Sequence, residues 1–438
     1  MSPEVVDKIN EIKNNEESEL NKLTIHQYNL ENLHQQNNFD YKALELQFYK
    51  FAADSQIYQK LQKVLQNFKS LTYLVIKIIN SDVNNQLIEK IADGISNLQK
   101  LTHLSLYLSK NQISSKGVGY IENCLYQCQS IRILKFSFNG NQQLGNQGAK
   151  HLANIIQKQE NIIELTINLA DCQIGESGIK NIANSIKKHE NLTKLYLNLH
   201  NNSLTDYGIT KLSESIQNLK KITQFKLNIE GNSNIYNSSI SSIAEALKNS
   251  ISIKKLTLKF FNIHINSNHG QKIAESLEKF QNMTELTLKL SQEDENQMAH
   301  QNIANALQKL EYISKLDLFI SDLNLEGLKL ISQAIKSYKY ISQLRLCLFD
   351  NQIGLEGAKI IAETIQTYYE LTNLTLQFDR DSIGIEGFNS IAQSLEKCKN
   401  IKKIILYGCY LSKSDQQDLE QRIKNFHKNI QIQIQDDD

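Results

Sequence analysis

The sequence predicts an α/β solenoid, a fold in which short parallel strands and helices alternate and each repeat packs on the next. The first observation is a segment of pattern Leu-Thr-x-Leu-x-Leu-x-Leu that begins at Leu71 and recurs at intervals of 28 to 31 residues. Its other copies begin at Leu101, Ile131, Ile162, Leu192, Ile222, Ile253, Met283, Ile313, Ile341, Leu371 and Ile401. The second observation is that apolar residues within each copy recur first at every second position and then at every third or fourth. A period of two is typical of a strand and a period near 3.6 of a helix, so each copy is predicted to be a strand followed by a helix.

The copy from Leu192 illustrates the two elements. Its core strand positions are Leu195, Leu197 and Leu199, and its helix positions are Ile209, Leu212 and Ile216. At the ends of the array, Tyr41–Phe48 fits as a degenerate first copy and His427–Ile434 keeps the strand alternation. The chain is therefore expected to hold about thirteen repeats of about 30 residues and a terminal strand.

The connection from strand to helix contains twelve of the seventeen glycines, for example in Gly-x-x-Gly at 175/178 and 354/357. Glycine permits a left-handed turn or a close approach of neighbouring backbones. Asn201, Asn351 and their equivalents suit the same connection, because a side-chain amide can bond free backbone groups. A small residue in each helix is predicted to let the helix pack closely on its strand. These residues are Ala153, Ala183, Ala244, Ala274, Ala304, Ala362 and Ala392.

The two ends are the candidate caps of the solenoid, since terminal repeats need a polar outer face. Residues 1–40 carry eight acidic side chains and three lysines, and we expect an acidic helical segment or cap there, with Ser2 as its N-cap and Pro3 at its first position. A docking segment for a partner is the alternative for these residues. The solenoid itself is assigned to residues 41–412, and residues 413–438 to a cap helix, a last strand and an acidic tail.

Composition excludes several classes of protein. The chain has 438 residues and a net charge of +1, so no global field holds a nucleic acid or an anionic membrane. No apolar run approaches the ~20 residues of a membrane span. The N-terminus is polar and lacks the apolar core of a signal peptide, so a cytoplasmic location is expected, with a cilium or another large assembly as an alternative.

No motif for catalysis, a metal or a cofactor is found. The six cysteines contain no CxxC pair, and the ten histidines share no catalytic spacing. Gly140-x4-Gly145 is followed by Asn146 rather than by Gly-Lys-Ser/Thr, so it is interpreted as the repeat turn and not as a phosphate-binding loop. The chain is predicted not to be an enzyme, to use no cofactor and to take no small-molecule substrate.

The repeat pattern resembles the leucine-rich repeats of the ribonuclease-inhibitor class over roughly residues 41–434. The resemblance implies a horseshoe with parallel strands on the concave wall and helices on the convex wall. The family pattern Leu-x-x-Leu-x-Leu-x-x-Asn/Cys-x-Leu is here Leu-x-x-Leu-x-Leu-x-Leu-x-x-Asn-x-Ile, which is two residues longer, so the strand or the following turn is expected to be extended. The copy from Ile313 lacks two residues, which predicts an irregularity near Ser321–Glu326.

The charge on one wall is the main functional signal. Strand side chains alternate, so the third, fifth and seventh positions of each copy are expected to line the concave wall. Ten of these side chains are basic and four are acidic, which gives this wall a charge of +6 in a chain of net charge +1. The candidate partner-binding residues are Lys194, Tyr196, Lys226, Lys255, Lys259, Lys289, Lys315, Phe319 and Arg345. Exposed strand positions also accept lysine as a solubilising charge, and that interpretation stays open.

The leading hypothesis is a non-enzymatic interaction scaffold that binds a protein partner, expected to be acidic, across the concave wall. One alternative is a Ran-type GTPase-activating protein, because a subset of the resembling family works from loops at one edge of the horseshoe. Those relatives carry a long acidic tail, and here only Asp436–Asp438 correspond. Another alternative is an architectural subunit of a large assembly, such as an axonemal complex or a ribonucleoprotein, so an RNA-containing partner stays open.

Overall fold

The computed structural model describes residues 22–26, 41–50, 55–292, 298–321, 323–348, 351, 353–378 and 383–435. The chain divides into two compact units, unit 1 from Met1 to Ser203 and unit 2 from Leu204 to Asp438. The expected N-terminal helix with Ser2 and Pro3 lies outside the described residues, as do the three terminal aspartates. In the described residues no helix is long and apolar enough to cross a membrane.

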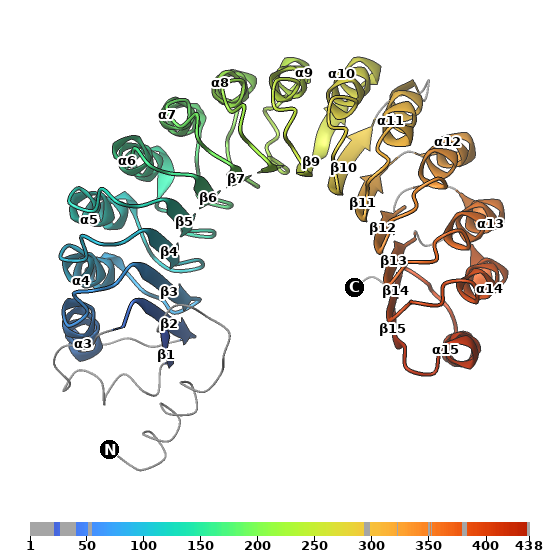
Figure 1. The fold of residues 1–438 in the computed structure, drawn as a ribbon, viewed down its shortest axis with the longest axis horizontal. Helices are drawn as coiled ribbons and strands as arrows, with labels where there is room; N and C mark the ends of the chain where they lie inside the picture. Colours follow the sequence, from blue (N-terminus) through green and yellow to red (C-terminus); the bar gives the residue numbers. More distant parts are fainter. Residues whose placement is uncertain are drawn as a thin grey trace, which may run out of the picture. The chain divides into compact units, whose positions relative to one another are not determined.

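Unit 1 alternates strands and helices from its first described residue (Figure 1). Its strands are β1 (Lys22–His26), β2 (Ala43–Tyr49), β3 (Tyr73–Ile79), β4 (His103–Tyr107), β5 (Ile133–Ser137), β6 (Glu164–Asn168) and β7 (Lys194–Asn198). Its helices are α3 (Ser55–Gln66), α4 (Asn85–Ile95), α5 (Ser115–Leu125), α6 (Gly145–Lys158) and α7 (Glu176–Ile186). The strands pair in chain order and all neighbours are parallel. Residues 22–26 thus add a strand to the sheet ahead of the first recognised repeat.

Unit 2 continues the same alternation. Its helices are α8 (Asp206–Ile216), α9 (Asn237–Leu247), α10 (Ser267–Leu277), α11 (Met298–Gln308), α12 (Leu325–Ile335), α13 (Gly354–Ile365), α14 (Gly384–Leu395) and α15 (Lys413–Phe426). Its strands are β8 (Gln224–Asn228), β9 (Lys255–Ile265), β10 (Glu285–Gln292), β11 (Lys315–Ile320), β12 (Gln343–Cys347), β13 (Asn373–Gln377), β14 (Lys403–Tyr407) and β15 (Gln431–Gln435). These strands also pair in chain order and in parallel.

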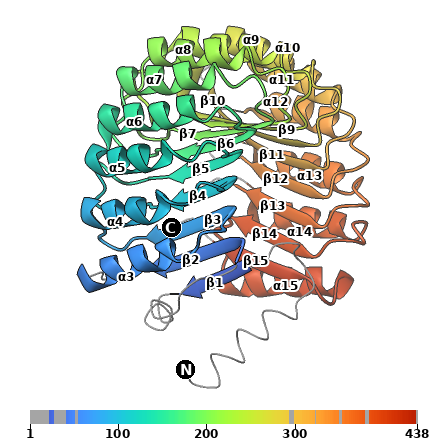
Figure 2. The same cartoon turned by 60° about the vertical axis from the view of Figure 1, so that its left-hand side comes forward.

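The predicted fold class is confirmed, because β2 to β14 are each followed by a helix and β15 ends the array. In each unit the helices lie on one side of the strands and leave the other side open (Figures 1 and 2). The apolar positions of the repeat form the core between the two layers. Leu165, Ile167 and Leu169 of one repeat are at most 1% exposed, as are Ile179, Ile182 and Ile186 in its helix. Each such side chain contributes about 1.5–3 kcal/mol when it leaves water.

The glycine positions serve the two purposes expected of them. Gly354 has a φ of 56°, in the left-handed region that favours glycine. Gly357 sits in the first turn of α13, where an added Cβ would lie 2.5 Å from the Cβ of Ile353. Gly354 permits the left-handed turn into the helix. Gly357 leaves room for the side chain of Ile353 to pack against the first turn of the helix.

A ladder of asparagines ties the turns of several repeats to the preceding repeat. The amide of Asn141 donates to Phe138 O at 2.6 Å and to Leu108 O at 3.0 Å, and its oxygen accepts from Ile113 N at 2.9 Å. Asn351 does the same in unit 2, as expected, with a bond of 2.9 Å to Ile320 O.

The expectation for Asn201 was wrong by one residue. Asn202 makes the ladder bonds, with 2.8 Å from its amide to Leu169 O and 2.8 Å from its oxygen to Ile174 N. Asn201 instead takes a left-handed φ of 50° and bonds the carboxylate of Asp171.

A second set of bonds between repeats lies just after eight of the described helices, where the sequence shows no common residue type. The side chain there bonds a backbone carbonyl 30 to 34 residues earlier. The residues that do so are Cys128, Gln159 and His189 in unit 1 and Ser250, Tyr338, Tyr368, Cys398 and His427 in unit 2. Five residue types thus meet one backbone requirement, since a buried carbonyl needs a hydrogen-bond partner.

The largest departure from the repeat is in β9 and β10, which have 11 and 8 residues whereas most of the other strands have five. Beyond Phe260 and Leu290 the pairing of the two strands shifts, so that Ser291 lies opposite His264. The apolar alternation of Phe260, Ile263 and Ile265 prolongs the strand before α10 begins. This bulged extension lies at the sheet edge where the strands end.

Candidate partner-binding face

The face of each sheet that the helices leave uncovered is here called the open strand face. The third, fifth and seventh positions of the repeats lie on it, as expected, because the alternate positions are buried under the helices. In β6, for example, Leu165 and Ile167 are buried whereas Glu164, Thr166 and Asn168 are partly exposed. A side chain at these positions is held by a strand that pairs with a neighbour on each side, so the face is rigid.

The two units differ in the charge of this face. On β2 to β7 it carries three basic and two acidic side chains, a net charge of +1. On β8 to β14 it carries seven basic and two acidic side chains, a net charge of +5. The seven are Lys226, Lys255, Lys259, Lys289, Lys315, Arg345 and Lys403.

The structure brings seven of the nine predicted residues together in unit 2. Lys226 lies on β8, Lys255 and Lys259 on β9, and the other four on β10 to β12. Lys289 is the register partner of Lys259 on one side and of Phe319 on the other. The two remaining predicted residues, Lys194 and Tyr196, are on β7 in unit 1. There the ammonium of Lys194 pairs with Glu164 at 2.5 Å.

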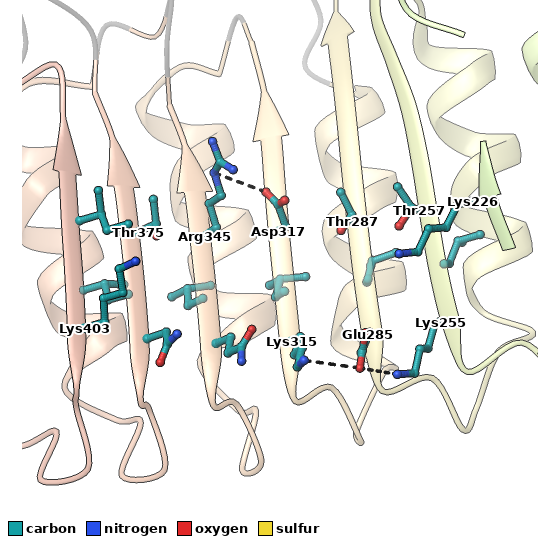
Figure 3. A pocket seen from close by; sticks show the side chains of 18 residues that line it. Lys226, Lys255, Thr257, Glu285, Thr287, Lys315, Asp317, Arg345, Thr375 and Lys403 are labelled. Atoms are coloured by element: carbon teal, nitrogen blue, oxygen red, sulfur yellow. Dashed lines mark hydrogen bonds and ion pairs between the residues drawn. The ribbon is translucent and has the colours of Figure 1, made fainter. Parts of the chain in front are cut away.

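The first exposed position of the strands forms a charged row across β9, β10 and β11. The carboxylate of Glu285 accepts a bond of 2.8 Å from Lys255 and lies 3.8 Å from the ammonium of Lys315, as Figure 3 shows. Because all three side chains are partly exposed, these pairs contribute little to stability, about 0–1 kcal/mol each. They do fix where the two ammonium groups lie.

The second exposed position is dominated by small side chains, Thr257, Thr287 and Thr375, with Asp317 and Arg345 between them (Figure 3). Asp317 Oδ1 and Arg345 Nε are buried and lie 4.0 Å apart, beyond hydrogen-bonding distance. Burial raises the pKa of Asp317, although Arg345, Lys289 and Lys259 act in the opposite direction. The carboxylate is therefore held among three cations in a poorly solvated place.

The third exposed position holds the residues with the least compensation. Lys259 and Lys289 lie side by side, and no carboxylate within the described part of the chain comes within 4.0 Å of either ammonium group. Burial, and next the charge of Lys289, lower the pKa of Lys259. The ammonium of Lys289 lies 5.6 Å from the ring centre of Phe319, which in turn meets Phe261 edge to face at 4.6 Å.

Three of the clustered cations, Lys255, Lys315 and Arg345, have carboxylate neighbours on the same face. Among the described residues, no carboxylate lies within 4.0 Å of the ammonium groups of Lys259, Lys289 or Lys403. Sequence analysis missed Phe261 as a member of this cluster, because the extension of β9 beyond the regular strand end places it there.

A shallow groove of about 360 Å³ runs across the strands of this face, from Lys226 to Lys403 (Figure 3). It is lined by charged side chains, by the threonines of the second position and by strand leucines such as Leu286 and Leu316. The groove is open to solvent. Sites for small molecules are mostly apolar clefts that enclose their ligand, so this shape favours a macromolecular partner.

Over the described ranges, no group of three or more His, Cys, Asp or Glu side chains could hold a metal ion. All six cysteines are buried. Burial raises the pKa of the Cys172 thiol to about 12 and that of Cys128 to about 11. Such thiols stay protonated near neutral pH and serve as packing residues.

No family profile and no curated protein matches this chain. A chain in the crystal structure of the Rad7 and Elc1 complex in yeast resembles it with 12% identity and a TM-score of 0.47, over 93% of this chain and 83% of that one. A chain in the crystal structure of the TLR13–ssRNA13 complex resembles it with 15% identity and a TM-score of 0.36, over 90% of this chain and 61% of that one. The assignment as an α/β repeat solenoid therefore depends on the strands, helices and repeat pattern of the chain itself.

Proposed function

We propose that this protein is a non-enzymatic interaction scaffold that binds an acidic protein partner across the open strand face of unit 2. The observation that supports this most is the net charge of +5 on β8 to β14, against +1 on the matching face of unit 1. If these lysines served only to keep the protein soluble, we would expect them in similar numbers on both units. A local excess of one charge speeds the encounter with a partner of opposite charge.

The geometry of the face supports a protein rather than a small molecule as the partner. The groove is shallow and crosses successive strands, so a partner would make many contacts of similar strength along it. Phe319 and Phe261 add apolar surface beside the charged side chains. Aromatic residues next to charged ones are typical of the residues that dominate binding energy in protein interfaces.

The finer assignments are part of the same proposal. The helix in every repeat supports the ribonuclease-inhibitor class of leucine-rich repeats. Six buried thiols are suited to a reducing compartment, which supports a cytoplasmic location. The same face would serve an adaptor that binds transiently and a permanent subunit of a larger assembly.

The test is capture of the partner from the native cell on the immobilised full chain, followed by mass spectrometry. The decisive variant is Lys255→Glu with Lys259→Glu and Lys289→Glu. The matched control changes three lysines at the same kind of position in unit 1, Lys77→Glu with Lys135→Glu and Lys194→Glu. Circular dichroism checks that both variants are folded.

We expect the unit 2 variant to lose the partner and the unit 1 variant to retain it. A folded unit 2 variant that captures the partner as well as the wild type would contradict the proposal. The search would then move to the helix-covered side.

A further inference from the structure

On the open strand face of unit 2, Lys259 and Lys289 are two adjacent cations that have no carboxylate partner within 4.0 Å among the described residues. They are register partners on adjacent parallel strands, which are about 4.8 Å apart. Their neighbours at the first position, Lys255 and Lys315, share Glu285.

The surroundings of this pair also depart from the repeat. β9 and β10 extend beyond the other strands and shift register directly after Phe260 and Leu290. The extension brings Phe261 against Phe319, with 4.6 Å between ring centres, and Phe319 lies next to the ammonium of Lys289. Bulges that redirect side chains are frequent beside functional sites. Here the extended strand places two phenylalanine rings next to the two lysines.

The charge of the pair indicates which ligand fits. Two neighbouring ammonium groups repel each other, and a single carboxylate compensates only one of them. A phosphate monoester carries a charge of about −1.5 to −2 at pH 7 and offers three acceptor oxygens, so it can compensate both. The positive charge of Arg345 also acts on Lys259. The buried Nε of Arg345 has no hydrogen-bond acceptor in the described structure.

We propose that Lys259 and Lys289 form a subsite for one phosphorylated side chain of the protein partner, beside the aromatic pair Phe261 and Phe319. This inference rests on the proposed function and names the chemistry that its strongest contact recognises. Phosphoserine would use the two ammonium groups alone. Phosphotyrosine would also place its ring against the aromatic pair.

A nucleic acid fits this face less well than a single phosphate does. A polynucleotide presents a phosphate at every residue and needs a continuous basic track. In unit 2 the carboxylates of Glu285 and Asp317 interrupt the groove next to this pair. In unit 1 the open strand face has a net charge of only +1. The cations without a carboxylate partner in the described structure therefore include one adjacent pair and do not form a continuous track.

The test is fluorescence anisotropy of the full chain with labelled degenerate peptides of fixed central residue. Three peptide libraries carry phosphoserine, phosphotyrosine or serine at the centre, and a fourth probe is a short single-stranded RNA of mixed sequence. We expect the wild type to bind at least one phosphorylated library about tenfold more tightly than the serine library. A stronger preference for phosphotyrosine would assign the aromatic pair to ring binding.

Three variants locate the effect. Lys259→Gln with Lys289→Gln should abolish the preference for phosphate, whereas Lys77→Gln with Lys135→Gln removes the same charge from unit 1 and should leave it intact. Asp317→Asn should strengthen phosphate binding, because it removes a carboxylate whose charge acts on both cations without changing the size of the side chain. A structural role of the lysines alone would not produce opposite effects at Lys289 and Asp317.

Equal binding of all three peptide libraries by the wild type would overturn the proposal. So would a preference that survives in the Lys259→Gln and Lys289→Gln variant, or RNA that binds this pair more tightly than the phosphopeptides do. Phosphatase treatment of the captured partner separates the two proposals. Unchanged capture after treatment contradicts the phosphate subsite alone, whereas unchanged capture by the unit 2 lysine-to-glutamate variant contradicts the proposed function.

Discussion

The two units are alike on the side of the strands that the helices cover and differ on the open strand face. In both, the buried strand positions hold leucine, isoleucine or phenylalanine, and an asparagine ladder ties the turns together. On the open strand face, unit 1 mixes three cations with two carboxylates and places the ring centres of Tyr73 and His103 4.1 Å apart, with the ring planes tilted by 39°. Unit 2 has a net charge of +5 on the same positions. The buried positions that make the fold are constant between the units, whereas the positions on the open strand face differ.

This comparison makes a first prediction, which concerns the shared core and has the largest expected effect. Leu197 in β7 and Leu288 in β10 occupy the same position of the repeat and are 2% and 0% exposed. Leu197→Ala and Leu288→Ala should each lower the free energy of unfolding of their own unit by roughly 2–5 kcal/mol, because buried methyl groups are lost and a cavity remains. Hydrogen exchange of peptides from each unit at rising urea concentration measures this. Unchanged protection in either variant would contradict the shared register of the core.

The second prediction concerns the shared turn. Gly145 in unit 1 and Gly354 in unit 2 have φ values of 55° and 56°. Gly145→Val and Gly354→Val should each destabilise by roughly 1–3 kcal/mol, since a branched side chain is strained at positive φ. Replacement by asparagine is the control and should cost less, because asparagine enters the left-handed region more readily. Thermal melting that is the same for valine and asparagine would show that the backbone conformation is not the cause.

The third prediction is the smallest and concerns a side chain that only unit 1 has on its open strand face. Burial, and next the charge of Lys135, lower the pKa of His103 from 6.5 to about 4. The unfolded chain therefore binds the proton first as the pH falls, so this residue costs unit 1 stability between pH 6.5 and pH 4 but not above pH 6.5. His103→Gln should reduce the loss of stability over this range. A pH profile of hydrogen exchange in unit 1 that is identical in wild type and variant would disprove it.

The architecture could be predicted because it is periodic. The repeat of about 30 residues and the change of apolar spacing locate every strand from β2 to β14 and the helix after each. The open positions followed from the same period of two. The ladder at Asn202 was assigned one residue early, at Asn201, because both neighbours are asparagine and only one side chain turns inward.

The parts that could not be predicted have no periodic signal. The set of bonds just after the helices uses Cys, Gln, His, Ser and Tyr, so no common residue marks it. The extensions of β9 to 11 residues and of β10 to 8 residues depart from the period, so aligning the copies does not indicate them. The pairing of Glu285 with Lys255 and Lys315 could have been found by aligning the copies in register. A sum of charges over the whole open strand face does not reveal this pairing.

The central claim is that the partner binds through the open strand face of unit 2, and its most direct test is the association rate constant of the captured partner at several ionic strengths. The three proteins to compare are the wild type, the variant with Lys255, Lys259 and Lys289 changed to Glu, and the variant with Lys77, Lys135 and Lys194 changed to Glu. We predict that association with the wild type and the unit 1 variant slows as salt rises, and that the unit 2 variant associates more slowly with a flatter salt dependence. A folded unit 2 variant with the rate and the salt dependence of the wild type would contradict the account.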